Sequence, residues 1–193
     1  MEQTLTPRDN ALKNLGRTIV NFQRLEHCLK LLAKLRPMNG TISKIQRDLE
    51  KHSEKTSGFT LGQAINAWLE TFDGYEPGQP VVNDLFEVTL KGEIEFNIAP
   101  EIKAAHAEQL RSLLIDRNGL IHGGLVEFDW DSPDDCRKLA SSLDELNEAI
   151  GEQIDFLLSI IRSLGSVIPE DFSVVESESG RTYILSNIKA GDA

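Results

Sequence analysis

The sequence predicts an all-α fold, a helical bundle of four or five helices of which two are long. Through most of the chain, apolar residues recur every three or four positions, which is the period of a helix with one buried face. Helix-capping residues precede these segments, and proline or glycine follows them. Close to the C-terminus the pattern changes, and there we expect a small β-hairpin or a tail.

The first long helix is expected to begin at Pro7, with Thr6 as its N-cap, and to continue to about Leu35. Pro37 and Gly40 then stop it. Its apolar stripe alternates by three and four residues and is predicted to be buried. The stripe comprises Leu12, Leu15, Ile19, Phe22, Glu26, Leu29 and Ala33. The carboxylate of Glu26 in the middle of this stripe predicts a charged partner, because burying an unpaired charge is costly.

Two shorter helices are expected next, a charged one over residues 42–55 and one that Thr60 caps and that extends to Phe72, with Trp68 in the core. Residues 73–80 are expected to form a loop. Residues 81–98 are ambiguous, because 81–90 fit a short helix whereas 93–96 alternate like a strand.

Pro100 begins the next helix, which Gly123 and Gly124 end. Its apolar side is predicted to comprise Ile102, Ala105, Leu110, Leu113, Leu114 and Ile121. The last long helix starts after Ser132, ends at Gly165 and would span roughly 45 Å. Helices of this length overhang a small bundle, so we expect their spare apolar surface to pack against a second copy. Residues 1–165 are therefore predicted to form the bundle domain.

The segment 166–193 is expected to be a hairpin or a flexible appendage. Residues 172–176 and 181–185 fit two strands around the turn-forming sequence Ser177-Glu178-Ser179-Gly180.

Charge and composition exclude several functional classes. The net charge of −11 disfavours unspecific binding to nucleic acid, although residues 1–55 carry a net +5 and residues 127–155 a net −8. No apolar run is long enough to cross a membrane, and no secretory signal is evident, so we expect a cytoplasmic protein. Cys28 and Cys136 are predicted to be free thiols, and no metal site or cofactor is expected.

Two segments have the spacing Arg-x4-His: Arg47 with His52, and Arg117 with His122. The first lies in the charged helix, where we expect His52 to be solvated. The second closes an apolar helix and precedes two glycines, so we favour it as a functional site. Arginine can grip phosphate oxygens, and histidine can transfer protons near neutral pH.

The stretch Arg117-Asn118-x-x-x-His122-Gly123 resembles the signature of the HEPN (higher eukaryotes and prokaryotes nucleotide-binding) domain family. The resemblance covers about residues 8–165 and includes the long first and last helices. It implies an all-α dimer and a metal-independent endoribonuclease, as found in bacterial toxin–antitoxin or phage-defence systems. RNA would be the substrate, and an antitoxin or regulatory protein would be a further partner. Gly119 inside the motif and the acidic composition depart from the family pattern.

The predicted catalytic residues are Arg117 and His122, supported by Asn118 and Glu26. His122 would act as acid or base, Arg117 would stabilise the charge on phosphorus, and Asn118 would orient the phosphate or ribose. We expect Glu26 to pair with Arg117. Residues five apart on a helix point about 140° from each other. Either Gly119 loosens the last turn, or two motifs face each other across a two-fold axis.

An alternative of another class is a non-catalytic dimeric helical module that binds a nucleotide, RNA or a protein partner. A third hypothesis is a structural dimer in which Arg117 and His122 form a helix cap. For His27 and His106 we expect surface or partly packed side chains, and for Trp130 either a packing or a contact role.

Overall fold

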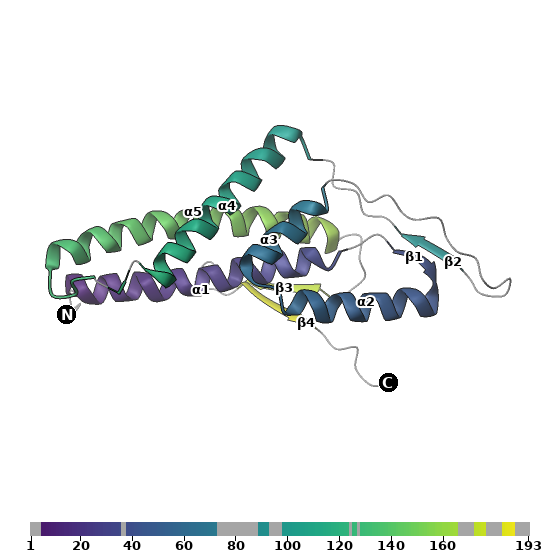
Figure 1. The fold of residues 1–193 in the computed structure, drawn as a ribbon, viewed down its shortest axis with the longest axis horizontal. Coiled ribbons are helices and arrows are strands. Elements are labelled where there is room, and N and C mark those ends of the chain that lie inside the picture. Colours follow the sequence, from purple (N-terminus) through teal and green to yellow (C-terminus); the bar gives the residue numbers. More distant parts are fainter. Residues whose placement is uncertain are drawn as a thin grey trace. The chain divides into compact units, whose positions relative to one another are not determined.

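The computed structural model is an all-α fold of five helices, two of them long, and it describes residues 5–35, 38–72, 89–92, 98–123, 125–126, 128–165, 172–176 and 183–187. The helices are α1 (Pro7–Ala33), α2 (Ile42–Ser57), α3 (Leu61–Glu70), α4 (Pro100–His122) and α5 (Pro133–Gly165). This arrangement, shown in Figure 1, confirms the predicted fold class. The chain divides into two compact units, Met1–Ile154 and Asp155–Ala193, which are described separately.

The predicted helix starts are confirmed by their capping contacts. The Thr6 side chain accepts a hydrogen bond from the backbone N–H of Asp9 at the start of α1. Thr60 and Gln63 form a reciprocal capping box at the start of α3. At the start of α5, the Ser132 Oγ accepts from the backbone N–H of Asp135 at 3.3 Å. Local sequence therefore sets these three boundaries.

Helix α1 packs against the N-terminal half of α5 through a row of buried polar side chains. Asn147 donates to Thr18 Oγ1 at 2.9 Å and to the Leu143 carbonyl at 2.7 Å. Asn14 donates to the Ala140 carbonyl at 3.0 Å, and Asn21 donates to Asn147 Oδ1 at 2.8 Å. The buried side of α1 thus includes Asn14 and Thr18, which lie at 4% and 0% exposure.

The predicted apolar stripe of α1 is consequently wrong in its N-terminal half. Leu12 and Ile19 are exposed, whereas the C-terminal members Phe22, Leu29 and Ala33 are buried. The helix is rotated relative to the prediction because the hydrogen bonds of Asn14 and Thr18 compensate for burying their polar groups. A pattern that counts apolar residues alone misses this compensation.

The main core lies where α3 packs on α1 and α4 packs on α3. Its fully buried side chains include Leu25, Leu29, Leu32, Leu61, Ile65, Trp68, Leu110, Leu143 and Ile150. The predicted core position of Trp68 is thereby confirmed. A smaller cluster joins Ala11, Cys136 and Ala140, and Phe128, Trp130 and Leu139 pack against it. Trp130 therefore has a packing role.

Two short antiparallel pairs accompany the helices. Strand β1 (Met38–Thr41) pairs with β2 (Thr89–Gly92), a pairing that the sequence did not predict. The expected loop 73–80 lies outside the described residues, as do residues 81–88 and 93–97, where the sequence fits a helix and a strand. Strand β3 (Phe172–Glu176) pairs antiparallel with β4 (Tyr183–Asn187), with Phe172 opposite Asn187. The first strand lies at the predicted residues, whereas the second begins two residues later than the predicted 181–185. Within the part of the chain that the structure describes, no helix is long and apolar enough to span a bilayer.

Candidate functional site

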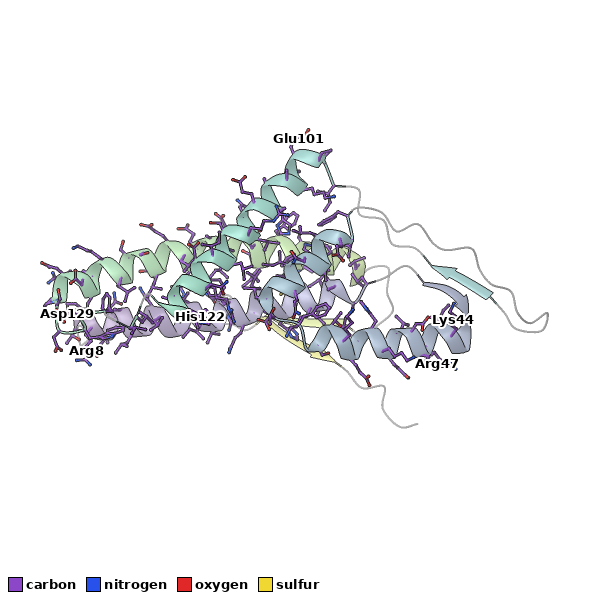
Figure 2. All side chains as sticks on the ribbon, in the orientation of Figure 1. Arg8, Lys44, Arg47, Glu101, His122 and Asp129 are labelled. Carbon is purple, nitrogen blue, oxygen red and sulfur yellow. The ribbon has the colours of Figure 1, made fainter. Side chains whose placement is uncertain are left out.

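The Arg117–His122 motif forms the last turn and a half of α4. Helical hydrogen bonding continues through it, since the backbone N–H of Gly123 donates to the Gly119 carbonyl at 3.2 Å. Gly119 lies within the helix, and a Cβ added there would meet nothing within 4 Å. Loosening of this turn at Gly119, one of the two alternatives, is therefore not observed. Figure 2 labels His122 at the C-terminal end of α4.

Arg117 lies on the inner side of α4. It follows the buried Leu110 by seven residues and the buried Leu113 by four, which places all three on one face of the helix. The Arg117 side chain is half-buried, and its Nη1 donates to Asn118 Oδ1 at 3.4 Å. The bond is long and links adjacent residues, so it holds the guanidinium only weakly.

His122 lies on the outer side of the same helix and is exposed. It follows Ile115 by seven residues, and the Ile115 side chain is 71% exposed. Ile121 is 49% exposed, so an imidazole stands among aliphatic side chains that face solvent. Ile121 was predicted to lie on the apolar side of this helix, facing the core. Its exposure shows that this prediction is wrong.

The two motif side chains consequently diverge within one subunit. On a regular helix, positions five apart differ by about 140° in direction, and α4 is regular here. Arg117 and His122 of one chain thus point to opposite sides of α4. Within one subunit the regular helix therefore cannot aim both side chains at one phosphate, and the arrangement with two copies stays a prediction.

Glu26 is engaged elsewhere on its own helix. Its Oε1 lies 2.8 Å from Lys30 Nζ in an i,i+4 pair, and both side chains are about three-quarters buried or more, at 25% and 20% exposure. The Lys30 ammonium also donates to the Ser57 carbonyl at 3.1 Å and so connects α1 to the end of α2. Glu26 does have a cationic partner, as its place in the sequence suggested, but the expected pairing with Arg117 is wrong.

The second Arg-x4-His segment, in α2, has a structural role. His52 is half-buried, and its Nε2 lies 2.9 Å from the Ala33 carbonyl at the C-terminus of α1, so the ring donates there. Arg47 is exposed. The expectation that His52 is solvated is therefore wrong, because α2 packs its C-terminal half against the end of α1.

His106 is more deeply buried than the sequence predicted, because only 4% of it is exposed and a surface or partly packed side chain was expected. Trp68 Nε1 donates to His106 Nε2 at 3.0 Å, and His106 Nδ1 lies 2.7 Å from Gln153 Oε1. Gln153 Nε2 then donates to Gln109 Oε1 at 2.7 Å. The network joins α3, α4 and α5. His106 precedes Leu110 by four residues and Leu113 by seven, a spacing that would have placed it on the buried face.

The chain's thiols and acidic groups do not assemble a metal site in the described ranges, where no group of three or more His, Cys, Asp or Glu side chains could hold an ion. Cys28 and Cys136 are free thiols, as predicted, and both are buried. Burial raises the pKa of the Cys28 thiol to about 12, so the thiolate that would bind a metal is disfavoured.

Comparison with protein-family models, with curated proteins and with solved structures gives no significant match.

Proposed function

We propose that this protein is a cytoplasmic, metal-independent endoribonuclease of the HEPN type whose active site is shared between two subunits. The observation that carries the proposal is the outer face of α4, where His122 is exposed beside Ile115 at 71% exposure. An exposed isoleucine next to a titratable side chain fits a surface that a second copy covers. Two such faces related by a two-fold axis would place two imidazoles close together, and each Arg117, about 140° round the same helix, would reach the shared phosphate from the rim of that interface.

The chemistry needs only groups that this site supplies. The ribose 2′-hydroxyl attacks the adjacent phosphorus, the P–O5′ bond breaks, and a 2′,3′-cyclic phosphate is left. A neutral His122 accepts the 2′-hydroxyl proton, and the protonated His122 of the second subunit donates a proton to the departing 5′-oxygen. The guanidinium of Arg117 stabilises the negative charge that develops on the phosphoryl oxygens.

The weak attachment of Arg117 is consistent with this role. Its contact with Asn118 is a 3.4 Å hydrogen bond between neighbouring side chains, which the guanidinium can exchange for a phosphate. Asn118 is exposed and so can turn towards the ribose or phosphate. Glu26 is paired with Lys30, and we assign it no part in the reaction.

The direct test is cleavage of a mixed-sequence RNA in EDTA, with the products analysed for 2′,3′-cyclic phosphate ends. His122→Ala and Arg117→Ala should each abolish cleavage with an unchanged circular dichroism spectrum. Arg111→Ala, which removes an exposed cation from the same helix, is the matched control and should retain activity. Ile115→Glu should convert dimers to monomers in sedimentation and abolish cleavage. Activity that persists in His122→Ala would overturn the proposal.

A non-catalytic helical module is the alternative, and two observations favour it. The net charge of −11 opposes binding of a polyanion, and Arg117 and His122 point apart on α4. In that case no RNA is cleaved, whereas binding of a nucleotide is measurable by isothermal titration calorimetry and is lost in Arg117→Ala. The same Arg111→Ala control separates a specific contact from a general loss of positive charge.

A further inference from the structure

The outer face of α1 carries an apolar stripe that is open to solvent in the described part of the chain. Leu12, Ile19 and Val20 are 45%, 43% and 44% exposed, and the half-buried Leu15 lies beside them. These four residues, together with Gly16, are called the outer stripe. Over this length the opposite side of α1 is buried and carries the polar Asn14 and Thr18, so the exposed outer stripe is the more apolar of the two sides. Single exposed aliphatic side chains are ordinary, but a cluster within two and a half turns indicates an interaction surface.

Gly16 lies in the middle of the outer stripe. A Cβ added to it would meet nothing within 4 Å, so no close approach among the described residues requires a glycine. Glycine in the interior of a helix is less favourable than alanine by roughly 0.8–1.0 kcal/mol. At Gly16 no side chain covers the backbone between Leu12 and Ile19. A second helix can therefore approach α1 closely at this point.

The charges along α1 indicate which kind of helix fits. Residues 8–34 contain six lysines and arginines and two acidic residues. Lys13 and Arg17 are exposed along one edge of the outer stripe. The Arg17 Nη1 lies 3.6 Å from Asp144 Oδ1 with both side chains more than half exposed, so this ion pair contributes little and is readily exchanged. An acidic helix complements the positive charge that Lys13 and Arg17 place along this edge.

We infer that the outer stripe of α1 is a docking site for an amphipathic helix of another protein, with apolar residues on one face and acidic residues along its edges. The partner's aliphatic side chains pack over Gly16 between Leu12 and Ile19. Its carboxylates pair with Lys13 and Arg17, the latter in place of Asp144. This surface is separate from the outer face of α4, so the inference does not depend on the proposed ribonuclease activity.

The test uses a fluorescent synthetic helix of about 20 residues with a leucine stripe flanked by glutamates. A second peptide, with lysine in place of each glutamate, is its control. In fluorescence anisotropy, the acidic peptide should bind the full chain at least about tenfold more tightly than the basic one. Gly16→Leu should abolish binding by covering the bare backbone. Gly151→Leu is the matched control, because a Cβ at Gly151 also meets nothing within 4 Å, and it should leave binding unchanged.

Several outcomes would overturn the inference. Equal binding of the two peptides, or binding that survives Gly16→Leu, would remove the proposed recognition. Dimers that Gly16→Leu dissociates in sedimentation would show that a second copy covers the stripe. Partition of the chain onto phosphatidylcholine–phosphatidylglycerol vesicles, with no peptide binding, would assign the stripe to a lipid surface. Thermal unfolding of both glycine variants establishes that each is folded, and unchanged RNA cleavage in Gly16→Leu separates this surface from the proposed active site.

Discussion

The indole N–H of Trp68 donates to His106 Nε2 at 3.0 Å, and this contact fixes the protonation state of a buried histidine. An indole nitrogen can only donate, so Nε2 must be unprotonated. The proton therefore lies on Nδ1, which faces Gln153 Oε1 at 2.7 Å. If Nε2 were protonated, its N–H would face the indole N–H of Trp68, and neither could accept. The folded protein therefore holds His106 in its neutral form.

The folded protein is accordingly expected to lose stability in mild acid. Burial lowers the pKa of His106 from 6.5, and the hydrogen bond to Gln153 opposes this only in part. The unfolded chain then takes up a proton that the folded chain does not. The contribution of His106 to stability is constant above about pH 6.5 and falls as the pH drops below it towards the lowered pKa. Urea unfolding between pH 8 and pH 5 measures this slope, and His106→Gln should reduce it. An unchanged slope in that variant would contradict the assignment.

Removing the Trp68 donor should also destabilise the fold. Trp68→Phe keeps an aromatic ring but leaves the buried His106 Nε2 without this donor, and we expect a loss of about 1–3 kcal/mol in the free energy of unfolding, or more if the smaller ring leaves a cavity. Phe72→Leu, which changes the ring that packs edge-on against Trp68 at a centroid distance of 4.6 Å, tests packing without touching the hydrogen bond. If Trp68→Phe is the milder of the two, the hydrogen bond contributes little.

The polar contacts between α1 and α5 predict an unusual sensitivity at Asn147. Asn147→Ala removes two donated hydrogen bonds and leaves the Asn21 amide without its acceptor, so we expect a loss of about 2–4 kcal/mol. Chemical denaturation measures the loss. Ser142→Ala, at an exposed position of the same helix, is the control and should change stability by less than about 0.5 kcal/mol.

Glycine substitutions should have opposite effects at two helical positions. An added Cβ at Gly62 would lie 3.3 Å from Leu114 Cδ2, so Gly62→Val should force α3 away from α4 and destabilise the fold by about 1–3 kcal/mol. Gly151→Ala meets no such obstacle and should stabilise by roughly 0.5–1 kcal/mol through helix propensity. Thermal unfolding of the two variants, compared with the parent chain, distinguishes close packing from propensity.

His52→Ala should lower stability and leave any RNA cleavage intact. The substitution removes the ring that donates to the Ala33 carbonyl, and with it a contact between α2 and the end of α1. We expect a loss of about 1 kcal/mol in urea unfolding. A loss of cleavage in folded His52→Ala, with His122 unchanged, would point to the α2 segment as the functional one.

Local sequence was sufficient for the helices and their ends. Thr6, Thr60 and Ser132 act on their own first turns, and these interactions need no distant partner. Apolar periodicity predicted the number of long helices for the same reason, since the period of a helix is a local property. The strand pair β1–β2 was missed because its two halves lie about 50 residues apart and neither alternates clearly.

The directions in which side chains point depend on tertiary packing. Leu12 and Ile19 face solvent because Asn14 and Thr18 find hydrogen-bonding partners in α5, which apolar counting cannot foresee. Glu26 pairs with Lys30 because a partner one turn away on the same helix is already within reach. Apolar spacing and the two terminal glycines were enough to place Arg117 and His122 on one helix. That they point to opposite sides of it depends on α4 staying regular through Gly119, and on which side of α4 packs against the core.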